Sequence, residues 1–372
     1  MAKIGIITYH FVPNYGAAMQ AWALQKYLCA LGHDAFLIDY RPSHLTTGGM
    51  FHFPKDAWTR RANLVIAYQK AMALKRMLSG DGGKADCFET FHRKYFNIQG
   101  PIYKSNQDLC RQPPEADVFV CGSDQIWNAS EQSGIDSSYF LDFAPKGVKR
   151  ISYAASFGRP YVHPRFEAET AALISQMDAI SVREESAVDL VQSMCGRDAS
   201  WVPDPTLMVE GGYPEAVEPE RATDYIFSYT LRSRELVAQI EAKMAQESGL
   251  EIVSPVTLAA SGEGAPGPLE WLGYIKAAKY VITNSYHGTL FSIIFKKPFV
   301  FVGLSGAKAG FNERAKSLLS RLGLQERMMN SFDEIRLESI LSAEIDWDSV
   351  GFEIDRWREQ ANSYLLDAIE QH

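Results

Sequence analysis

Apolar and polar positions along this chain follow two alternating periods. Short apolar runs rich in β-branched residues are followed by longer stretches in which apolar residues recur at helical spacing. The first run covers residues 3–9, a helical stripe over 17–31 ends at Gly32, and a second apolar run covers 35–40. Strands that alternate with helices are typical of parallel sheets covered by helices. The pattern therefore predicts an α/β fold that begins with a β-α-β unit.

The same alternation continues and is interrupted once. Further strands are predicted over 117–121, 150–154 and 179–182, with a helix beginning near Glu184. A stretch rich in glycine, proline and acid at 209–221 then breaks the pattern, as linkers between domains do. A second series follows, which comprises a strand over 225–229, a helix near 233–248, a strand over 250–253, a helix from Leu269 and a strand-to-helix turn within 279–295.

The length of the chain fits two hydrophobic cores better than one. With 372 residues and 46% apolar content, the chain exceeds the usual size of a single core and can fill two. We predict an N-terminal Rossmann-like domain over 1–210 with a helical insert over about 46–114, and a C-terminal Rossmann-like domain over 222–345. Residues 346–372 are predicted to form a helix that packs across both domains. The basic residues of the insert favour a solvated helix face over a lid or an acceptor-binding arm.

Composition excludes several classes of function. The 37 Lys and Arg residues against 45 Asp and Glu give a net charge of −8, which argues against a nucleic-acid partner. No stretch of about 18 apolar residues occurs, and the N-terminus turns polar too soon for a signal peptide. We expect a soluble, cytoplasmic protein without a transmembrane segment, with peripheral contact at the inner face of the membrane left open. The oligomeric state is not predicted.

The cysteines and histidines form no metal-binding motif in the sequence. The five cysteines are scattered and never occur as a C-x-x-C pair, and the eight histidines show no H-x-x-x-H spacing. Metal-binding motifs in short segments depend on such spacings, although distant residues can also assemble a site. We therefore expect neither a metal nor a cofactor.

The strand-to-helix turn within 279–295 carries the densest set of candidate ligand groups. Residues at a helix start present free backbone N–H groups at the positive end of the helix dipole, which favours an anion and most often phosphate. His287 is a candidate acid or base there, and a structural role for it is weighted equally. The candidate phosphate ligands are Asn284, Ser285, Gly288 and Thr289.

Polar residues also follow two strands of the predicted N-terminal domain. The loop after the first strand offers His10, Asn14, Tyr15 and Gly16, with an ordinary loop as the alternative. The loop after the strand at 117–121 contains Asp124, a candidate general acid or base whose alternative role is a helix cap or turn. The amide, hydroxyl and indole groups around it suit a sugar, and these candidate acceptor contacts are Ser123, Gln125, Trp127 and Asn128.

Two further charged residues stand at strand ends. Arg183 lies where a strand meets a helix, so it can bind a carboxylate or phosphate of a ligand. The alternative is an internal ion pair with Glu184, with Glu185 or with a residue elsewhere in the chain. Asp204 lies in a turn between Pro203 and Pro205, where a structural role is slightly favoured over a role as a base.

Taken together and in this order, six motifs between Lys3 and about Gly323 resemble the polysaccharide pyruvyl transferase family. Each motif alone is weak, but six in series are specific. The motifs are NYGA at 14–17, GSDQIWN at 122–128, YAASFG at 153–158, SVRE at 181–184, PDPT at 203–206 and TNSYHGT at 283–289.

The resemblance implies a glycosyltransferase B-like fold of two Rossmann-type domains. It also implies transfer of a pyruvyl group from phosphoenolpyruvate to sugar hydroxyls of a cell-surface polysaccharide or its precursor, as a cyclic ketal. In the family the segment that matches 285–287 reads Arg-Leu-His, so His287 carries over and Ser285 stands in place of the arginine. Arg183 is similar to a further arginine of the family's donor site. With Ser285 at this position the chain lacks the arginine that would bind the carboxylate or phosphate of the donor through two hydrogen bonds. The resemblance therefore supports the fold more firmly than the identity of the donor.

The expected partners are therefore a small-molecule donor and a glycan acceptor, free or lipid-linked. In the expected mechanism His287 acts as acid or base, Asp124 or Asp204 deprotonates hydroxyls, and the turn with Arg183 holds the phosphate. Two alternatives stay open at this point. One is a nucleotide-sugar glycosyltransferase on the same fold, and the other is a non-catalytic carbohydrate-binding or assembly protein.

Overall fold

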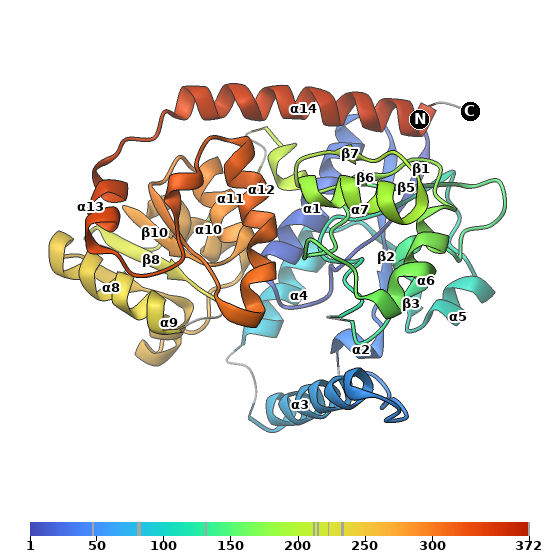
Figure 1. Cartoon of the computed structure of the whole chain (residues 1–372), viewed down its shortest axis with the longest axis horizontal. Coiled ribbons are helices and arrows are strands. Elements are labelled where there is room, and N and C mark those ends of the chain that lie inside the picture. The colour runs from blue at the N-terminus through green and yellow to red at the C-terminus, as the bar shows by residue number, and fades with distance from the viewer. Residues whose placement is uncertain are drawn as a thin grey trace. The chain divides into compact units, whose positions relative to one another are not determined.

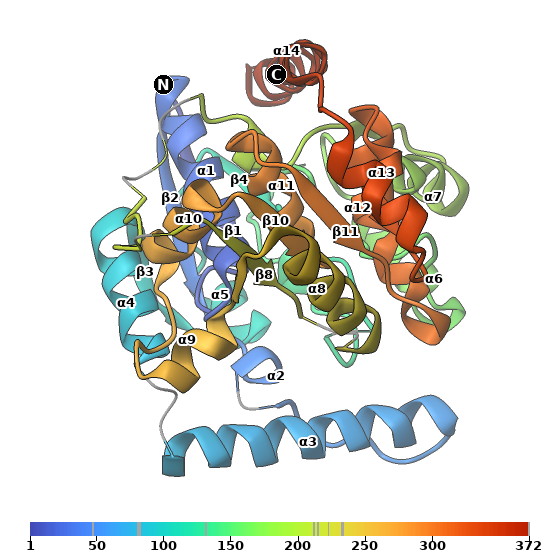
Figure 2. The ribbon, with the colours of Figure 1, turned by 90° about the vertical axis from the view of Figure 1, so that its left-hand side faces the viewer.

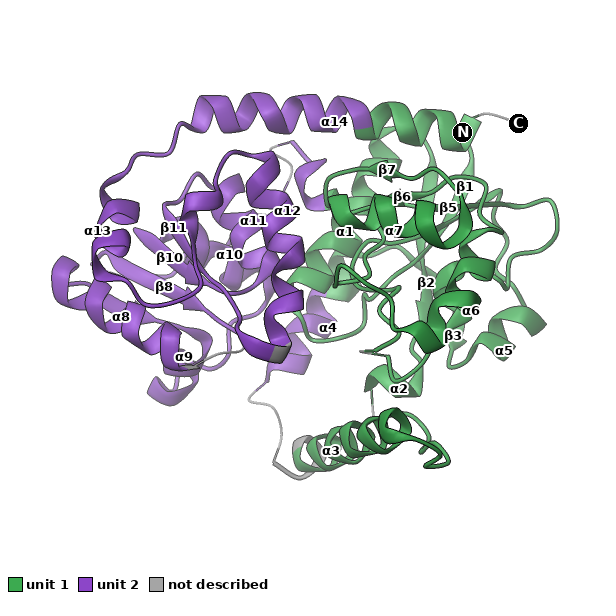
Figure 3. Ribbon diagram, in the orientation of Figure 1, with its two compact units in different colours: residues 1–81, 92–205, 361–372 green, residues 82–91, 206–360 purple. Residues whose placement is uncertain are grey.

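Two parallel β-sheets organise the chain, and each belongs to its own unit (Figure 1). Unit 1 comprises residues 1–81, 92–205 and 361–372, and unit 2 comprises residues 82–91 and 206–360 (Figure 3). The computed structural model describes the whole chain except residues 47, 80–82, 131, 211–212, 214–215, 222, 232–233 and 371–372. The division after Pro205 falls near the predicted end of the first domain at 210, while Gly211, Gly212 and Pro214 of the predicted linker lie outside the described residues.

The main sheet of unit 1 has five strands in the order β3-β2-β1-β4-β5, and every neighbouring pair is parallel. The short strands β6 and β7 pair in parallel beside it, and the bridges of Ala179 to Ile151 and of Val182 to Ala155 connect them to the β5 side. The strands are β1 (Lys3–Ile7), β2 (Asp34–Tyr40), β3 (Ile98–Tyr103), β4 (Val118–Cys121), β5 (Lys149–Ser152), β6 (Ser181–Val182) and β7 (Ser200–Trp201).

Helices and short 3-10 turns connect these strands. Asn14 begins the first helix, because its side-chain oxygen accepts a hydrogen bond from the backbone N–H of Ala17 at 3.2 Å. The elements are α1 (Tyr15–Ala30), α2 (Ser43–Thr46), α3 (Ala57–Ser79), α4 (Lys84–Tyr95), α5 (Asn106–Arg111), η1 (Ser137–Phe140), α6 (Pro164–Ile174), α7 (Glu185–Cys195) and η2 (Pro205–Leu207). Residues 84–91 of α4 belong to unit 2.

The predicted helical insert at 46–114 is not helical throughout. It contains α3, α4 and α5, but it also contains β3, which pairs in parallel with β2 at the edge of the sheet. Gly100 and Pro101 interrupt the apolar pattern of this strand, and an edge position tolerates proline because one side of the strand needs no hydrogen bonds. The insert therefore contributes a strand to the sheet of unit 1.

Unit 2 repeats the same architecture with the strand order β12-β11-β10-β8-β9, again parallel throughout. Its core gathers apolar residues of the strands and of α8, among them Ile226, Ile240, Ile282, Val300 and Met329. The strands are β8 (Tyr225–Tyr229), β9 (Glu251–Val253), β10 (Tyr280–Thr283), β11 (Phe299–Val302) and β12 (Met328–Met329). The helices and turns are α8 (Arg234–Ser248), α9 (Pro255–Ser261), α10 (Pro268–Ala277), α11 (Tyr286–Ile294), η3 (Gly306–Asn312), α12 (Glu313–Arg321), η4 (Gln325–Arg327) and α13 (Glu334–Ser342).

The last helix, α14 (Trp347–Glu370), contributes residues to both units, since 347–360 belong to unit 2 and 361–370 to unit 1. In unit 2 its Arg358 donates a hydrogen bond of 2.5 Å from Nε to the carbonyl oxygen of Leu207. In unit 1 the Tyr364 hydroxyl donates to the carbonyl oxygen of Ser152 at 2.7 Å, at the end of β5. No described helix is both long enough and apolar enough to cross a membrane.

Candidate active site

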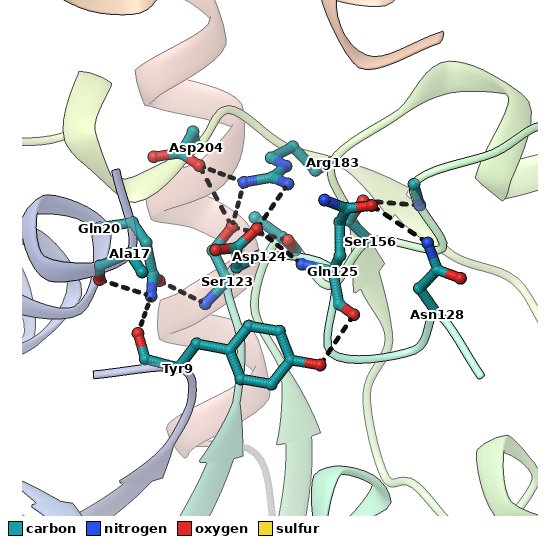
Figure 4. Close-up of polar contacts among 12 residues, drawn as sticks. Tyr9, Ala17, Gln20, Ser123, Asp124, Gln125, Asn128, Ser156, Arg183 and Asp204 are labelled. Atoms are coloured by element: carbon teal, nitrogen blue, oxygen red, sulfur yellow. Dashed lines mark hydrogen bonds and ion pairs between the residues drawn. The ribbon is translucent and has the colours of Figure 1, made fainter. Parts of the chain in front are cut away.

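A buried arginine in unit 1 is surrounded by three carboxylates that come from the ends of three strands. Figure 4 shows two of them, Asp124 and Asp204, beside the Arg183 guanidinium. Arg183 directly follows β6, and its side chain is 0% exposed. Nη1 of Arg183 lies 2.7 Å from Oδ2 of Asp204, Nη2 lies 3.5 Å from Oδ1 of Asp124, and Nε lies 3.4 Å from Oε1 of Glu184. The guanidinium is therefore paired within the protein. This is the internal ion pair that the sequence left open, and it includes Asp124 and Asp204 as well as Glu184.

Hydroxyl groups complete the pairing of these charges. Ser156 donates a hydrogen bond of 2.6 Å to Oε1 of Glu184, and the backbone N–H of Gly158 donates to the Ser156 hydroxyl at 2.9 Å. The Ser123 hydroxyl accepts from Nη1 of Arg183 at 3.3 Å and donates to the carbonyl oxygen of Ala154 at 2.9 Å. Buried charges are tolerated when such partners satisfy them, so the network is stable only as a whole.

Asp124 is the one carboxylate of this network with an exposed part. Its side chain is 13% exposed, whereas those of Asp204 and Glu184 are 0% and 2% exposed. The backbone of Asp124 has a φ of 73°, a left-handed conformation that side chains other than glycine adopt at some energetic cost and that is often found at functional sites. Solvent can thus reach Asp124, while Asp204 is fully buried and pairs with Arg183.

The loop that carries Asp124 is anchored to β1 and α1 by residues that the sequence analysis did not single out. Gln20 of α1 accepts a hydrogen bond from the backbone N–H of Ser123 at 3.0 Å and donates one to the Thr8 hydroxyl at 2.9 Å. The Tyr9 hydroxyl donates to the carbonyl oxygen of Gln125 at 3.2 Å (Figure 4). Gln20 is a fully buried amide within an otherwise apolar helix stripe. A polar residue at an apolar position of the stripe could have indicated a buried hydrogen-bonding partner of this kind.

Glycine is required at the start of the same loop. Gly122 has a φ of +125°, and a Cβ at this position would lie 2.0 Å from the carbonyl oxygen of Tyr153. The loop after β4 consequently lies directly against the segment after β5, where Ala154 and Ser156 contribute to the network.

Most of the predicted acceptor contacts are buried rather than directed outward. His10, Tyr15, Trp127 and Asn128 are 1%, 1%, 2% and 4% exposed, and Gly16 and Ser123 are buried as well. Trp127 donates from Nε1 to the carbonyl oxygen of Tyr139 and stacks on Phe140, because its indole fills the core under the loop. His10 lies 3.4 Å from Asp39 through Nε2. Asn14, which is exposed, and Gln125, which is half-buried, are the predicted contacts that solvent reaches.

In unit 2 the predicted turn lies between β10 and α11. The Ser285 hydroxyl accepts a hydrogen bond from the backbone N–H of Gly288 at 3.3 Å and so caps the helix. The Thr289 hydroxyl donates to the carbonyl oxygen of Ser285 at 3.1 Å, and the Asn284 side chain accepts from the backbone N–H of Leu231 at 2.6 Å. A Cβ at Gly288 would lie 2.3 Å from the Thr283 hydroxyl oxygen, so this helix start needs glycine.

The turn has one titratable side chain and one nearby cation. His287 is 6% exposed and lies in the first turn of α11. The guanidinium of Arg314, at the start of α12, lies 5.7 Å from the centre of the Tyr286 ring. Tyr286 directly follows Ser285 in the sequence. The structure thus places Arg314 beside the start of α11.

A cavity of about 510 Å³ in unit 2 is lined mainly by apolar residues of α11 and α14, among them Ile293, Phe295, Val350 and Ile354. A second cavity, of about 500 Å³, lies in unit 1 where β2 and β3 end. Its lining combines polar residues with apolar ones such as Met50, Phe51 and Ile66. Nε2 of His44 lies 3.5 Å from Oδ2 of Asp136, and the Tyr40 hydroxyl donates to the same oxygen at 2.7 Å.

The second cavity is connected to the loop of Asp124. Gln132 lines the cavity and donates from Nε2 to the Tyr9 hydroxyl at 2.6 Å, and Tyr9 in turn contacts Gln125. Burial and the adjacent carboxylate of Asp136 raise the pKa of Tyr40, so its hydroxyl stays protonated and donates. The sequence analysis missed this cavity because its residues come from segments that are far apart in the chain.

Among the described residues, the carboxylates of Glu247, Glu334 and Glu338 are close enough together to hold a metal ion. All three are exposed, and Nζ of Lys243 forms ion pairs with each of them. A lysine already balances this charge, so the trio reads as a surface ion-pair cluster and not as a catalytic centre.

Comparison with known protein families gives a match over most of the chain. The family model described as polysaccharide pyruvyl transferase matches residues 14–306. No curated protein matches the sequence.

Comparison with solved structures gives the fold. The S. aureus MnaA-UDP co-structure superposes with a TM-score of 0.51 at 12% identity, covering 98% of this chain and 97% of that one. A putative UDP-N-acetylglucosamine 2-epimerase from Listeria monocytogenes superposes with a TM-score of 0.52 at 11% identity, covering 98% and 95%. At this identity the likeness concerns the fold alone, and it confirms the predicted glycosyltransferase B-like fold of two Rossmann-like domains.

Proposed function

Because the chain belongs to the polysaccharide pyruvyl transferase family, we propose that it transfers a pyruvyl group from phosphoenolpyruvate to two hydroxyls of one sugar residue. The acceptor is a bacterial cell-surface polysaccharide or its precursor, and the product is a cyclic ketal. The family match over residues 14–306 is the observation that carries this proposal. The enzyme is a transferase on this ground, and its donor, acceptor and cytoplasmic location belong to the proposal.

The donor binds at the turn of unit 2 in this proposal. The backbone N–H groups at the start of α11 and the Ser285 hydroxyl, which accepts from Gly288 and keeps its own proton to donate, favour a phosphate group, which the positive end of the helix dipole also attracts. Ser285 is uncharged, so the positive charge that the family's arginine brings must come from another residue. Arg314 is the nearby cation in the same unit and takes that role here.

The chemistry needs an acid, a base and two additions. His287 protonates the methylene carbon of phosphoenolpyruvate, and one sugar hydroxyl attacks the neighbouring carbon, forming the first C–O bond. Asp124 accepts the proton of that hydroxyl. A second hydroxyl of the same sugar then forms the second C–O bond as the C–O bond to phosphate breaks, and its proton leaves with the phosphate. Arg183, which is itself paired with Asp204, positions Asp124.

The acceptor binds to unit 1 in this proposal. Asp124 and the half-buried Gln125 face the reacting sugar, and the cavity beside β2 and β3 holds a neighbouring sugar residue of the glycan. A volume of about 500 Å³ is within the range of small-molecule sites, and its polar lining from His44, Asn106 and Asp136 suits hydroxyl groups. The connection through Gln132 and Tyr9 links this cavity to the Asp124 loop.

The test incubates the purified protein with phosphoenolpyruvate and methyl β-glycosides of glucose, galactose, mannose and their 2-acetamido counterparts. We expect release of inorganic phosphate that depends on the sugar, together with a product that contains both pyruvate and sugar by mass spectrometry. His287→Gln should abolish this release. As a matched control, His163→Gln changes a histidine that caps α6 and contacts Arg165 and Phe166 of that helix, and it should leave the rate unchanged.

Phosphate release without any sugar product would contradict transfer to sugars. If no glycoside supports release of phosphate from phosphoenolpyruvate, but a UDP-sugar is consumed when a glycoside is present, the protein is a nucleotide-sugar glycosyltransferase and the proposed donor is wrong.

A further inference from the structure

One surface of unit 1 exposes large apolar side chains to an unusual extent. Met50, Phe51 and Phe53 precede α3 and are 88%, 58% and 77% exposed. On α3 itself Leu64 and Tyr68 are 72% and 65% exposed, and Val65 and Leu74 are 42% and 53% exposed. Soluble proteins seldom leave such a contiguous apolar surface uncovered unless it binds something. We call this set of residues, within 50–75, the α3 surface.

The opposite side of α3 is anchored to unit 1. Ile66 and Ala62 are 0% and 8% exposed. The Trp58 ring packs edge-on against Phe166 with ring centres 5.1 Å apart, and the guanidinium of Arg165 lies 4.5 Å above Trp58. Figure 2 shows α3 as one continuous helix that follows α2 at the outside of the fold. The helix is therefore held by one side while the α3 surface stays accessible.

The charges around the α3 surface have one sign. Residues 50–79 contain six Lys and Arg residues and a single acidic residue, Asp56, in a chain whose net charge is −8. Asp56 is bound to Arg165 at 3.2 Å, outside the helix. Arg60, Arg61, Lys70 and Lys75 are all exposed on α3 beside the apolar residues. Within the helix, residues 57–79, the sequence contains no acid.

We propose that the α3 surface binds the surface of a membrane that contains anionic lipids. Exposed Leu, Phe, Tyr and Met side chains enter the boundary between headgroups and acyl chains, while Arg and Lys side chains reach the lipid phosphates. Each basic residue at such a surface contributes about 1 kcal/mol, and apolar insertion adds to this. A lysine above an aromatic ring, Lys70 over Phe51 at 5.8 Å, shows how apolar and basic groups alternate on this surface. The binding does not depend on the proposed transferase reaction.

A lipid surface explains the combination better than a protein partner does. A second copy of this chain that met this surface with its own α3 surface would bring like basic charges against it. A continuous anionic plane matches both the apolar and the basic groups of a single long helix.

The experiment measures sedimentation of the full chain with vesicles of phosphatidylcholine alone and of phosphatidylcholine mixed with phosphatidylglycerol. We expect binding to the anionic vesicles to exceed binding to the neutral ones by about tenfold or more and to weaken at high salt. Leu64→Ser/Tyr68→Ser should reduce binding to the anionic vesicles at least about fivefold, because two inserted side chains are lost. Arg60→Gln/Arg61→Gln should reduce it by a similar factor and remove part of the salt dependence.

The matched control is Ile335→Ser on α13, an exposed apolar residue at 80% exposure that lies in unit 2, and it should leave vesicle binding unchanged. All altered side chains are exposed, so the variants should unfold at the wild-type urea concentration. The proposal is overturned if the wild type does not bind anionic vesicles, or if both α3 variants bind like the wild type. It is also overturned if the wild type is a dimer that Leu64→Ser/Tyr68→Ser converts to a monomer, because a second copy then covers the α3 surface.

Discussion

The Arg183 network of unit 1 and the turn of unit 2 both lie at the carboxyl ends of parallel strands, but their charges differ. In unit 1 one guanidinium is surrounded by three carboxylates, so the region carries excess negative charge. In unit 2 the groups at the turn are hydroxyls, amides and backbone N–H groups at a helix start, with His287 and the nearby Arg314. The first region is suited to hydroxyls that must lose protons, and the second is suited to an anion.

The comparison shows that one architecture can present two differently charged regions, to which the proposed reaction assigns different roles. Both units present polar side chains where their strands end, as open α/β sheets generally do. The two units differ in the charged groups that their loops place at the carboxyl ends of the strands. In unit 1 the arginine pairs with carboxylates, and in the proposed reaction the carboxylate of Asp124 is the group that meets the acceptor. The predictions below test this division, beginning with the largest expected effect.

Asp124→Asn should reduce phosphate release from phosphoenolpyruvate in the presence of an acceptor about 10²- to 10⁴-fold, as loss of a general base does. The amide cannot accept the hydroxyl proton, although it keeps the shape of the side chain. The control is Asp189→Asn, an exposed residue of α7 in the same unit. A rate for Asp124→Asn equal to that of the control would remove Asp124 from the mechanism.

Arg183→Met should lower the free energy of unfolding by about 3 to 5 kcal/mol, because it leaves buried carboxylates without their cation. Urea denaturation followed by circular dichroism measures this loss. Arg183→Lys should lose less, since it keeps the charge but not the three-way geometry. If Arg183→Met unfolds at the wild-type urea concentration, the carboxylates are not held by this arginine and the contrast between the two regions fails.

His92 in unit 1 should make the stability of the protein depend on pH. Burial, helped by the positive charges of His10 and Arg41, lowers the pKa of His92 to about 4, below the usual value of 6.5. Between these two pH values the unfolded chain binds a proton at His92 that the folded chain does not bind. The neutral, buried His92 therefore contributes fully to the free energy of unfolding above pH 6.5, and this contribution is lost as the pH falls from 6.5 towards 4. The loss should be on the order of 2 to 3 kcal/mol.

Unfolding by urea at a series of pH values measures this dependence, and His92→Gln should flatten it over that window. The variant also separates an effect of pH on stability from an effect of pH on activity, since activity should keep its pH dependence in His92→Gln. An unchanged stability profile in the variant would show that other groups cause the acid sensitivity.

Ser285 offers the smallest and most specific test. Ser285→Ala should cost about 1 kcal/mol of stability, because α11 loses its cap. Ser285→Asp keeps a cap for the helix but places a negative charge where the donor phosphate is proposed to lie, so stability should return while the KM for phosphoenolpyruvate rises. A KM for Ser285→Asp equal to that of the wild type would place the donor elsewhere.

The sequence predicted the elements whose patterns are local. The strand over 225–229 is β8, the helix from 269 corresponds to α10, and the turn before His287 lies between β10 and α11 as expected. β3 was missed because Gly100 and Pro101 hide an edge strand, and β11 was not predicted although it is an apolar run. A pattern of apolar and polar residues identifies a short strand only when the flanking residues also follow the expected strand or helix period.

The candidate site was predicted in part, and the rest depends on contacts between distant segments. Asp124, Arg183 and Asp204 were each identified at a strand end, but only the folded chain shows that one guanidinium binds both aspartates. Sequence spacing suggested Glu184 as the partner because it is adjacent. Similarly, His44 and Asp136 are far apart in the chain, so no motif could reveal the cavity that they line.

The central claim is that phosphoenolpyruvate binds at the turn of unit 2 and not at the Arg183 network of unit 1. Titration of isotopically labelled protein with phosphoenolpyruvate, followed by the NMR signals of the backbone amides, tests it directly. The account predicts that the amide signals of residues 285–288 shift and saturate while those of 122–125 stay in place. Saturating shifts at 122–125 and at Arg183, with none at 285–288, would contradict it.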